Sequence, residues 1–219
     1  MFITVCGQKG GVAKTCTSIH LASVWHSEGK KVCIVDADKN RSALAYSSRG
    51  NLPFPVFPVS SAAKASRSSE IVITDGQASS DTEELKHLAY GSDLVILPTT
   101  AKARSVELAS LLNNLKVNHA VVIVKVDFRQ QKAAQQAKAA LENFGLHVFD
   151  TFIPLLSAFD KAEASGNAVF EAVDDLGRSD PRRMTGWSAY CSIASQIPCL
   201  ISKHSSDTNN LNNQQLISA

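Results

Sequence analysis

The sequence lacks the features that mark several large classes of protein. No stretch approaches the roughly 18 consecutive apolar residues of a membrane span, and the first residues lack the basic start, apolar stretch and cleavage site of a secretory signal. The five cysteines are odd in number and show no CxxC spacing, which indicates neither a disulfide framework nor a zinc site. No histidine pair has HxxxH spacing and no segment reads GxSxG, so a metallohydrolase or serine hydrolase has little support. We therefore expect a soluble, cytoplasmic protein with no integral membrane association.

Charge of one sign is also scarce. The formal net charge is +2 over 219 residues, so any binding of nucleic acid would need a local basic patch. Apolar residues make up 44% and charged residues 19%, the balance of an ordinary globular protein. The length fits one large domain, which we expect over residues 1–203. The last segment, 204–219, is rich in Asn, Gln and Ser, and it is predicted to be disordered because it has too few apolar residues to pack.

Short apolar, β-branched runs alternate with segments of helical length. Several of the runs are continuously apolar, as expected for parallel strands that are covered on both faces. The predicted strands are 2–6, 31–36, 54–59, 70–75, 93–98, 119–126 and 147–154. The predicted helices are 15–28, 40–48, 81–90, 103–117, 130–144, 157–165 and 181–201, with 60–69 either a loop or a short helix. This βαβ series predicts an α/β fold, a doubly wound and mostly parallel sheet with helices on both faces.

Residues 7–16, GQKGGVAKTC, form a glycine-rich segment between an expected strand and an expected helix. Gly7, Lys14 and Thr15 match the phosphate-loop pattern GxxxxGK[ST], and Ala13 stands where the second glycine would be. Alanine fits there if that residue is helical. Backbone N–H groups at the start of a helix bind anions, Lys14 would reach the β- and γ-phosphates of a nucleotide, and the Thr15 hydroxyl would bind Mg²⁺. The alternative is a plain strand-to-helix turn with an incidental Lys-Thr.

Three carboxylates follow expected strands. Asp36 and Asp38 end the run KVCIVDAD, and Asp75 ends EIVITD. In open α/β sheets ligands bind at the carboxyl edge of the strands, and a magnesium-ordering aspartate occupies this place in phosphate-loop enzymes. Any one acid at a strand end is commonplace. Three of them, together with a phosphate loop, favour a site for a nucleotide and Mg²⁺.

The segment from Gly7 to Thr15 resembles the deviant phosphate loop of the ParA/MinD family of ATPases, which carries an extra signature lysine, here Lys9. The resemblance covers about residues 1–200, continuing through Asp36-x-Asp38, Asp75 and the segments 93–109 and 153–172. It implies a phosphate-loop NTPase that hydrolyses ATP weakly until a partner stimulates it. Two subunits would enclose two ATP molecules, with Lys14 acting on its own nucleotide and Lys9 on that of the partner subunit.

The resemblance also assigns roles to individual residues. The catalytic set would be Lys9, Lys14 and Asp38, with Asp38 orienting the attacking water and Asp36 nearer a structural role. The nucleotide would contact Gly7, Lys9, Gly10, Gly11, Val12, Ala13, Lys14, Thr15, Cys16, Lys125, Asp127, Pro154 and Leu155. The Mg²⁺ ligands would be Thr15, Asp36, Asp38 and Asp75. The sequence departs from the family in Lys39-Asn40 after Asp38 and in Gly76-Gln77 after Asp75, where many relatives have Pro-Gln and Thr-Pro.

Relatives of this kind bind DNA or membrane in their ATP form and leave it when an adaptor stimulates hydrolysis. The Asn/Gln-rich end lacks the basic amphipathic helix of membrane-bound members, so nonspecific DNA and a nucleoid location are favoured. The expected DNA contacts are Arg129, Lys132, Arg178, Arg182, Arg183 and Lys203. Cargo could be a plasmid, a chromosome region or a carboxysome, and the divergent Ala13 and Asp38-Lys39-Asn40 resemble the carboxysome-positioning branch most.

Other functions remain open at this stage. A MinD-like switch on a membrane surface, a small-molecule ligase of the same superfamily, or a nucleotide-dependent binding switch with little turnover would carry much of the same sequence. An amidase of this superfamily needs a glutaminase domain for which the chain has no room. The nitrogenase iron protein needs cysteines in the 93–100 or 127–131 segments, where this chain has none.

Overall fold

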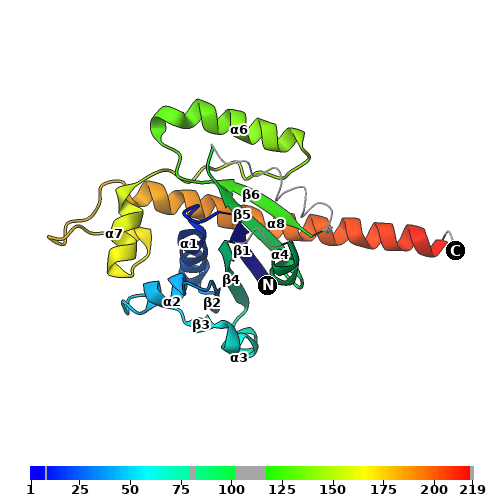
Figure 1. The fold of residues 1–219 in the computed structure, drawn as a ribbon, viewed down its shortest axis with the longest axis horizontal. Helices are drawn as coiled ribbons and strands as arrows, with labels where there is room; N and C mark the ends of the chain where they lie inside the picture. The colour runs from blue at the N-terminus through cyan, green and yellow to red at the C-terminus, as the bar shows by residue number, and fades with distance from the viewer. Residues whose placement is uncertain (8, 79–81, 102–116, 218–219) are drawn as a thin grey trace.

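The structure is a computed structural model, and it describes residues 1–7, 9–78, 82–101 and 117–217. A parallel sheet of six strands lies at the centre of this part of the chain, in the order β3-β2-β4-β1-β5-β6 (Figure 1). All of its five strand pairings are parallel. The strands are β1 Phe2–Gly7, β2 Val32–Ala37, β3 Val56–Pro58, β4 Ile71–Ala78, β5 Leu94–Thr99 and β6 His119–Ile123. The doubly wound α/β sheet predicted from the sequence is confirmed.

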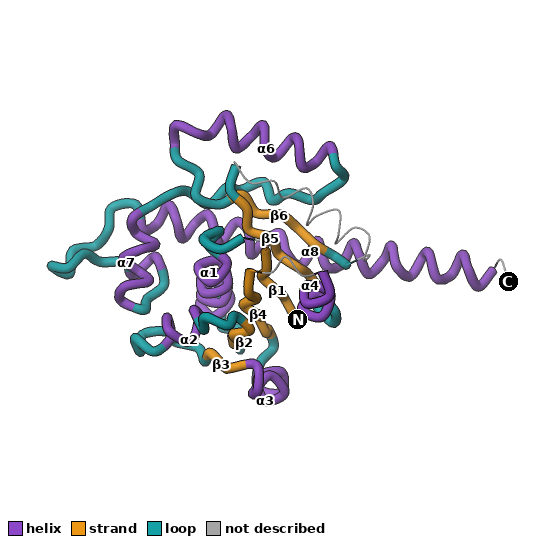
Figure 2. The backbone as a smooth tube through the Cα atoms, in the orientation of Figure 1, coloured by secondary structure: helices purple, strands orange, loops and turns teal. Residues whose placement is uncertain are grey.

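Helices cover both faces of this sheet, as Figure 2 shows by element type. The described α-helices are α1 Lys14–Ser27, α2 Ser42–Ser47, α3 Ala62–Ser68, α4 Thr82–Ala89, α6 Gln131–Asn143, α7 Ser157–Ser165 and α8 Arg183–Ile217. Short 3-10 turns lie at η1 Val59–Ser61, η2 Phe128–Gln130 and η3 Val169–Glu171. The expected helix 103–117 falls almost wholly outside the described residues.

Alternate residues of each strand point to opposite faces, which divides the core in two. Ile34 of β2 packs in the larger cluster, with residues of α1 and α8. Its neighbours Cys33 and Val35 pack on the other face against Ala65 of α3. On that second face α6 packs against β5 and β6 through residues such as Leu141. Because both faces are buried, the strands read as continuous apolar runs in the sequence.

Helix α1 is buried on most of its sides because it lies between the sheet and α8. Its apolar side chains, such as fully buried Leu21, belong to the largest core cluster. Polar residues inside it bond to the helix itself: the Ser23 hydroxyl donates to the carbonyl of Ile19 over 2.8 Å. This packing holds the first turn of α1, and therefore the end of the phosphate loop, against the carboxyl edge of the sheet.

Two expectations about secondary structure are not met. The segment 147–154 is not a regular strand: it forms isolated bridges, Val121 with Val148 and Val126 with Pro154, and a backbone bond from Ile153 N–H to the carbonyl of Ile123. The two bridges are five positions apart on one segment and six on the other, so the register slips by one residue and no continuous ladder forms. The segment 204–219, expected to be disordered, continues α8 as far as Ile217.

The long α8 passes through Pro198 without ending. A proline removes one backbone hydrogen bond, but no further proline or glycine follows it, and Asn, Gln and Ser each cost less than about 0.7 kcal/mol in a helix. The carboxyl-terminal half of α8 projects away from the sheet (Figure 1). Among the described helices, none is both long and apolar enough to cross a membrane.

Candidate functional site

The phosphate loop joins the end of β1 at Gly7 to the start of α1 at Lys14. The residue before the helix, Ala13, has φ 59° and ψ 33°, which is the left-handed region and not the helical one expected for it. A residue with a Cβ atom pays roughly 1–2 kcal/mol there, whereas glycine does not. The glycine of the common pattern therefore suits a left-handed backbone at this position, and this chain adopts the same backbone with a strained alanine.

Lys14 is buried beneath the loop, with 7% of its surface exposed. Its ammonium nitrogen donates to the main-chain oxygen of Lys9 over 3.2 Å, so the loop folds back over the lysine. The residue Lys9 is itself exposed, and it is not among the residues that line the adjoining cavity. One lysine is thus held inside the site, while the other lies on the outer side of the loop.

Asp75 of β4 lies directly under the first turn of α1 and is fully buried. One carboxylate oxygen accepts a hydrogen bond from Thr15 Oγ1 over 2.8 Å, and the other accepts one from Ser18 Oγ over 2.9 Å. Burial raises the pKa of this carboxyl from 3.8 to about 7, the two hydroxyl donors oppose that shift, and the charges of Asp36 and Asp38 add to it. A cation at this place would favour the charged carboxylate.

The two acids after β2 differ in their bonding. Both oxygens of Asp36 accept backbone N–H groups, from Asp38 over 3.0 Å and from Leu44 over 2.8 Å. This bonding favours a structural role for Asp36, and its role as a Mg²⁺ ligand stays a prediction. Asp38 is partly exposed, lines the cavity, and accepts the N–H of Asn40 over 2.8 Å.

A cavity of about 710 Å³ opens beside the phosphate loop. Of the residues predicted to contact a nucleotide, those that line it are Gly10, Gly11, Ala13, Lys14, Thr15, Cys16, Lys125, Pro154 and Leu155. Gly7 and Val12 lie behind the loop and are buried there. Asp127 does not line the cavity either: its side chain accepts the N–H of Arg129 over 2.8 Å and caps η2. The structure therefore supports a capping role for Asp127 better than a contact with the nucleotide.

The cavity has walls that the sequence reasoning missed. They come from residues 38–42 after β2, which we call the switch, and from α2, the end of β4, the residue after β6, and α7 with the segment before it. These residues are Lys39, Asn40, Ser42, Tyr46, Gln77, Val124, Ile153, Leu156, Phe159, Asp160 and Glu163. Tyr46 is fixed by a hydrogen bond from its hydroxyl to the carbonyl of Asn167 over 2.7 Å. Asp160 and Glu163 are three residues apart on α7, a spacing that places both on one face of the helix. This spacing is the feature of the sequence that could have indicated the two acids as part of a site, but acids on the exposed face of a helix often have the same spacing.

Backbone strain gathers around this cavity. Besides Ala13, the non-glycine residues with positive φ in the described chain are Arg41, at 53°, and Lys125, at 56°. Lys125 lines the cavity, and Arg41 lies between two residues that do. Conformations of this kind persist where the surrounding structure enforces them, and they concentrate at ligand sites.

A buried histidine ties the phosphate-loop helix to the η3 turn. His20 Nδ1 lies 2.7 Å from the carbonyl of Cys16, and Nε2 accepts the N–H of Val169 over 3.1 Å. This pairing fits a neutral ring with the proton on Nδ1, and burial lowers the pKa of His20 to about 4. Burial also raises the pKa of the neighbouring Cys16 to about 12, so Cys16 remains a thiol.

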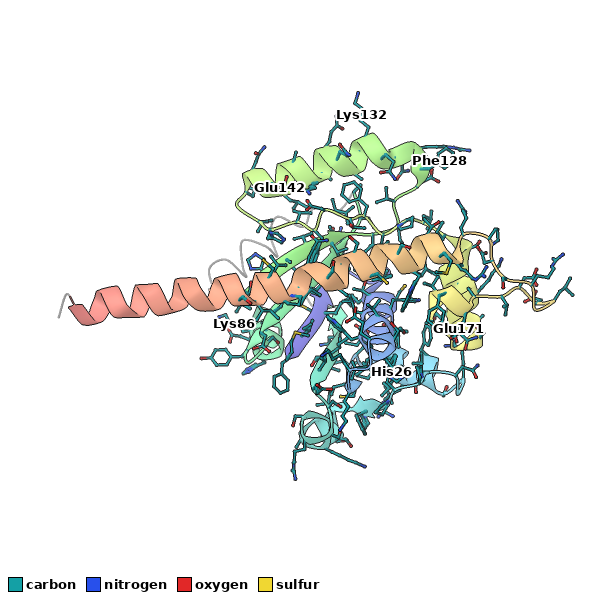
Figure 3. All side chains as sticks on the ribbon, turned by 180° about the vertical axis from the view of Figure 1, so that it is seen from behind. His26, Lys86, Phe128, Lys132, Glu142 and Glu171 are labelled. Carbon is teal, nitrogen blue, oxygen red and sulfur yellow. The ribbon has the colours of Figure 1, made fainter. Side chains whose placement is uncertain are left out.

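The predicted DNA contacts do not share one environment. Arg129 and Lys132 are exposed at η2 and the first turn of α6, where Figure 3 shows Lys132 pointing outward. Arg178 pairs with Asp174 over 2.7 Å, and Arg183 donates to the carbonyl of Asp180 over 3.0 Å. Arg182 is exposed, and Lys203 lies in α8 with its side chain outside the described part. Their contact with DNA stays a prediction.

Residues 3–169 match the family described as the CobQ/CobB/MinD/ParA nucleotide binding domain. The chain belongs to this family. The resemblance to ParA and MinD drawn from the phosphate loop is thereby confirmed.

Individual relatives agree with this assignment. The chain is 26% identical over 183 residues to "Maintenance of carboxysome distribution protein A" of Gloeobacter kilaueensis, covering 77% of this chain and 83% of that protein. The MinD cell division protein of Aquifex aeolicus superposes with a TM-score of 0.69 at 14% identity, covering 90% of this chain and 96% of the other. The ATP complex of a McdA variant from Cyanothece gives 0.65 at 16%, covering 90% and 96%. At such identities the two structures support the fold.

Proposed function

We propose that the protein is an ATPase that positions a cargo: it binds ATP with Mg²⁺, pairs with a second copy in that state, and holds to nonspecific DNA of the nucleoid. An adaptor protein stimulates its weak hydrolysis and so releases it. The observation that carries this proposal is the hydrogen bond from Thr15, at the floor of a cavity of about 710 Å³, to Asp75, which is buried behind that floor.

The residues at this floor fit Mg²⁺ and phosphate. Thr15 and Asp75 offer the hydroxyl and carboxylate oxygens that Mg²⁺ prefers, and Asp38 adds a second carboxylate at the cavity wall. The first N–H groups of α1 have no partner within the helix and can bind phosphate oxygens, beside the buried ammonium of Lys14. When bound, Mg²⁺ supplies positive charge that neutralises the β- and γ-phosphate oxygens.

The side of the cavity formed by α7 and the segment before it suits a nucleoside. Phe159, Leu155 and Leu156 offer apolar surface to a flat base. The carboxylates of Asp160 and Glu163 can accept hydrogen bonds from ribose hydroxyls, whereas they would repel phosphate. The charge along the cavity thus runs from positive at Lys14 to negative at α7, which orients a nucleotide with its phosphates toward the loop.

Likeness to relatives supports the role in positioning. The 26% identical protein of Gloeobacter kilaueensis is named for carboxysome distribution, and a McdA structure is described as an ATP complex. We therefore favour a carboxysome as the cargo over a plasmid or a chromosome region. Lys9 is exposed and does not line the cavity of its own subunit, which supports a role at the nucleotide of a partner subunit.

The test measures ATP affinity with and without Mg²⁺ by calorimetry. The protein should bind ATP more tightly in the presence of Mg²⁺, and this gain should fall at least tenfold in a Thr15→Ala variant, which removes the proposed ligand. Thr185→Ala, on the exposed first turn of α8, is the matched control and should bind as the unchanged protein does. Equal affinity with and without Mg²⁺ would contradict the proposed site.

A further inference from the structure

Gln77 is a polar side chain of β4 on the wall of the cavity. It lies on β4, two residues beyond Asp75, and only 7% of its surface is exposed. It lines the cavity, and the described part of the chain provides no hydrogen-bond partner for its amide. The amide of Gln77 is not among the buried side-chain atoms that lack a partner, so it is accessible from the cavity. A ligand in the cavity can therefore form hydrogen bonds with it.

Strand register places Gln77 at the phosphate end of the cavity. On one side Gly76 pairs with Ala37 of β2, which leads into Asp38. On the other side Ala78 pairs with Gly7, where the phosphate loop begins. Gln77 therefore lies between the loop that cradles phosphate and the switch that carries Asp38. The apolar side chains around Phe159 come from α7 and the segment that leads into it.

An irregularity in the sheet accompanies this position. One residue on β1 separates Val5 from Gly7, while two on β4 separate their partners Asp75 and Ala78. The extra residue makes a bulge at Gly76-Gln77. The side chain of Asp75 points toward α1, where it bonds Thr15, and residues two apart on a strand share a face. Gln77 therefore points to the same side of the sheet as Asp75, and the bulge lies beside the candidate site, where such irregularities are common.

We propose that Gln77 is a catalytic residue of ATP hydrolysis, whose amide holds the attacking water against the terminal phosphate. The carbonyl oxygen of Gln77 would accept a hydrogen bond from the water, and its NH₂ group would donate to a γ-phosphate oxygen. An amide can do both at once, whereas a carboxylate only accepts and an ammonium only donates. This role rests on the proposed function and adds to it a residue outside the phosphate loop and the aspartates.

The step that Gln77 assists is hydrolysis, which needs water as its only co-reactant. The water oxygen forms a bond to the γ-phosphorus, and the bond from that phosphorus to the β-phosphate oxygen breaks. The β-phosphate oxygen keeps the electron pair, and the water proton passes to the released phosphate or to solvent. Positioning of this kind lowers the barrier without Gln77 changing its own protonation.

The experiment compares Gln77→Ala and Gln77→Glu with the unchanged protein in two binding measurements and one rate. Affinity for ADP and for a non-hydrolysable ATP analogue should stay within about threefold. Affinity for ADP with aluminium fluoride, which mimics the transferring phosphate and its in-line water, should fall at least tenfold in both variants. Hydrolysis should fall by about 10²-fold, the usual loss for one transition-state donor. Gln135→Ala, an exposed glutamine on α6, is the matched control and should change none of these values.

Two outcomes would overturn the proposal. An equal loss of affinity for ADP, the ATP analogue and the fluoride complex would make Gln77 an ordinary binding or folding residue. Unchanged affinity for the fluoride complex would remove it from the site. Failure of the unchanged protein to bind the ATP analogue would instead contradict the proposed function itself, so the two failures are distinguishable.

Discussion

Ala13 connects the phosphate loop to α1 in a left-handed conformation, with φ 59°. We predict that Ala13→Gly raises the free energy of unfolding by about 0.5–1 kcal/mol, because relief of the Cβ strain exceeds the extra flexibility of glycine in the unfolded chain. Denaturant unfolding measures this. The control Ala139→Gly, at an exposed helical position of α6, should lose about 1 kcal/mol. A loss of stability in both variants would show that the strain at Ala13 is not relieved by glycine.

The same residue shows where prediction from sequence stops. The pattern of Gly7, Lys14 and Thr15 identifies the loop, because the chemistry of phosphate binding fixes those residue types. The backbone angle of Ala13 has no such signature, because it depends on how β1 and α1 are joined in space. Gln77 was visible in the sequence only as a departure from relatives, and its burial beside the loop needed the register of three strands.

At the scale of elements, the first turn of α6 is the best placed of the predicted DNA contacts. The amino end of a helix carries positive partial charge, and exposed Arg129 and Lys132 add to it. Neutralising both with alanine should weaken DNA binding for all sequences alike, and lower the slope of log affinity against log salt by about 2, near 0.9 per phosphate contact. Fluorescence anisotropy in the ATP state at several salt concentrations measures both effects.

The control for this pair removes the same charge elsewhere. Lys30 and Lys31 are exposed in the turn before β2, at the amino edge of the sheet and opposite the nucleotide site. The Lys30→Ala, Lys31→Ala variant should keep the slope of the unchanged protein. If both double variants lose affinity equally, net charge alone governs binding and the surface at α6 has no special part.

Elements were predicted well where burial on both faces left a continuous apolar run, as in β2 and β5. The segment 147–154 has a similar composition, but its register slips by one residue between its bridges at Val148 and Pro154, and composition does not reveal such a slip. For the carboxyl end of α8 the prediction was disorder, whereas the structure has a helix as far as Ile217. Low apolar content excludes packing, but it does not stop a helix that has already begun from continuing.

At the scale of the whole molecule, the sheet brings three strand ends to one edge. Val5 of β1 pairs with Asp75 of β4, which pairs in turn with Asp36 of β2. The phosphate loop, the switch and Gln77 therefore lie side by side, although they are up to about seventy residues apart in sequence. Lys9 is the exposed lysine of this group, and we propose that it reaches a second copy.

We predict that Lys9 acts across a dimer, and mixing two inactive variants tests this. Lys9→Ala should keep ATP affinity yet lose stimulated hydrolysis, and Asp38→Ala should also bind ATP without turnover. In a mixed dimer, the site of the Lys9→Ala subunit has its own Asp38 and receives Lys9 from the partner. An equal mixture should therefore regain about a quarter of the unchanged activity, since about half the dimers are mixed and each has one complete site.

The alternative geometry gives the opposite result. If Lys9 served its own nucleotide, neither site of a mixed dimer would be complete: one would lack Lys9 and the other Asp38. The mixture would then be as inactive as each variant alone, while light scattering with ATP would still report dimers. A mixture of the Lys14→Ala and Lys9→Ala variants provides the same comparison without relying on Asp38. Lys14→Ala should itself weaken ATP binding, because the buried ammonium of Lys14 lies under the phosphate loop and is expected to contact the phosphates. Recovery in the Asp38 mixture together with dimers in each variant would assign Lys9 to the partner's site.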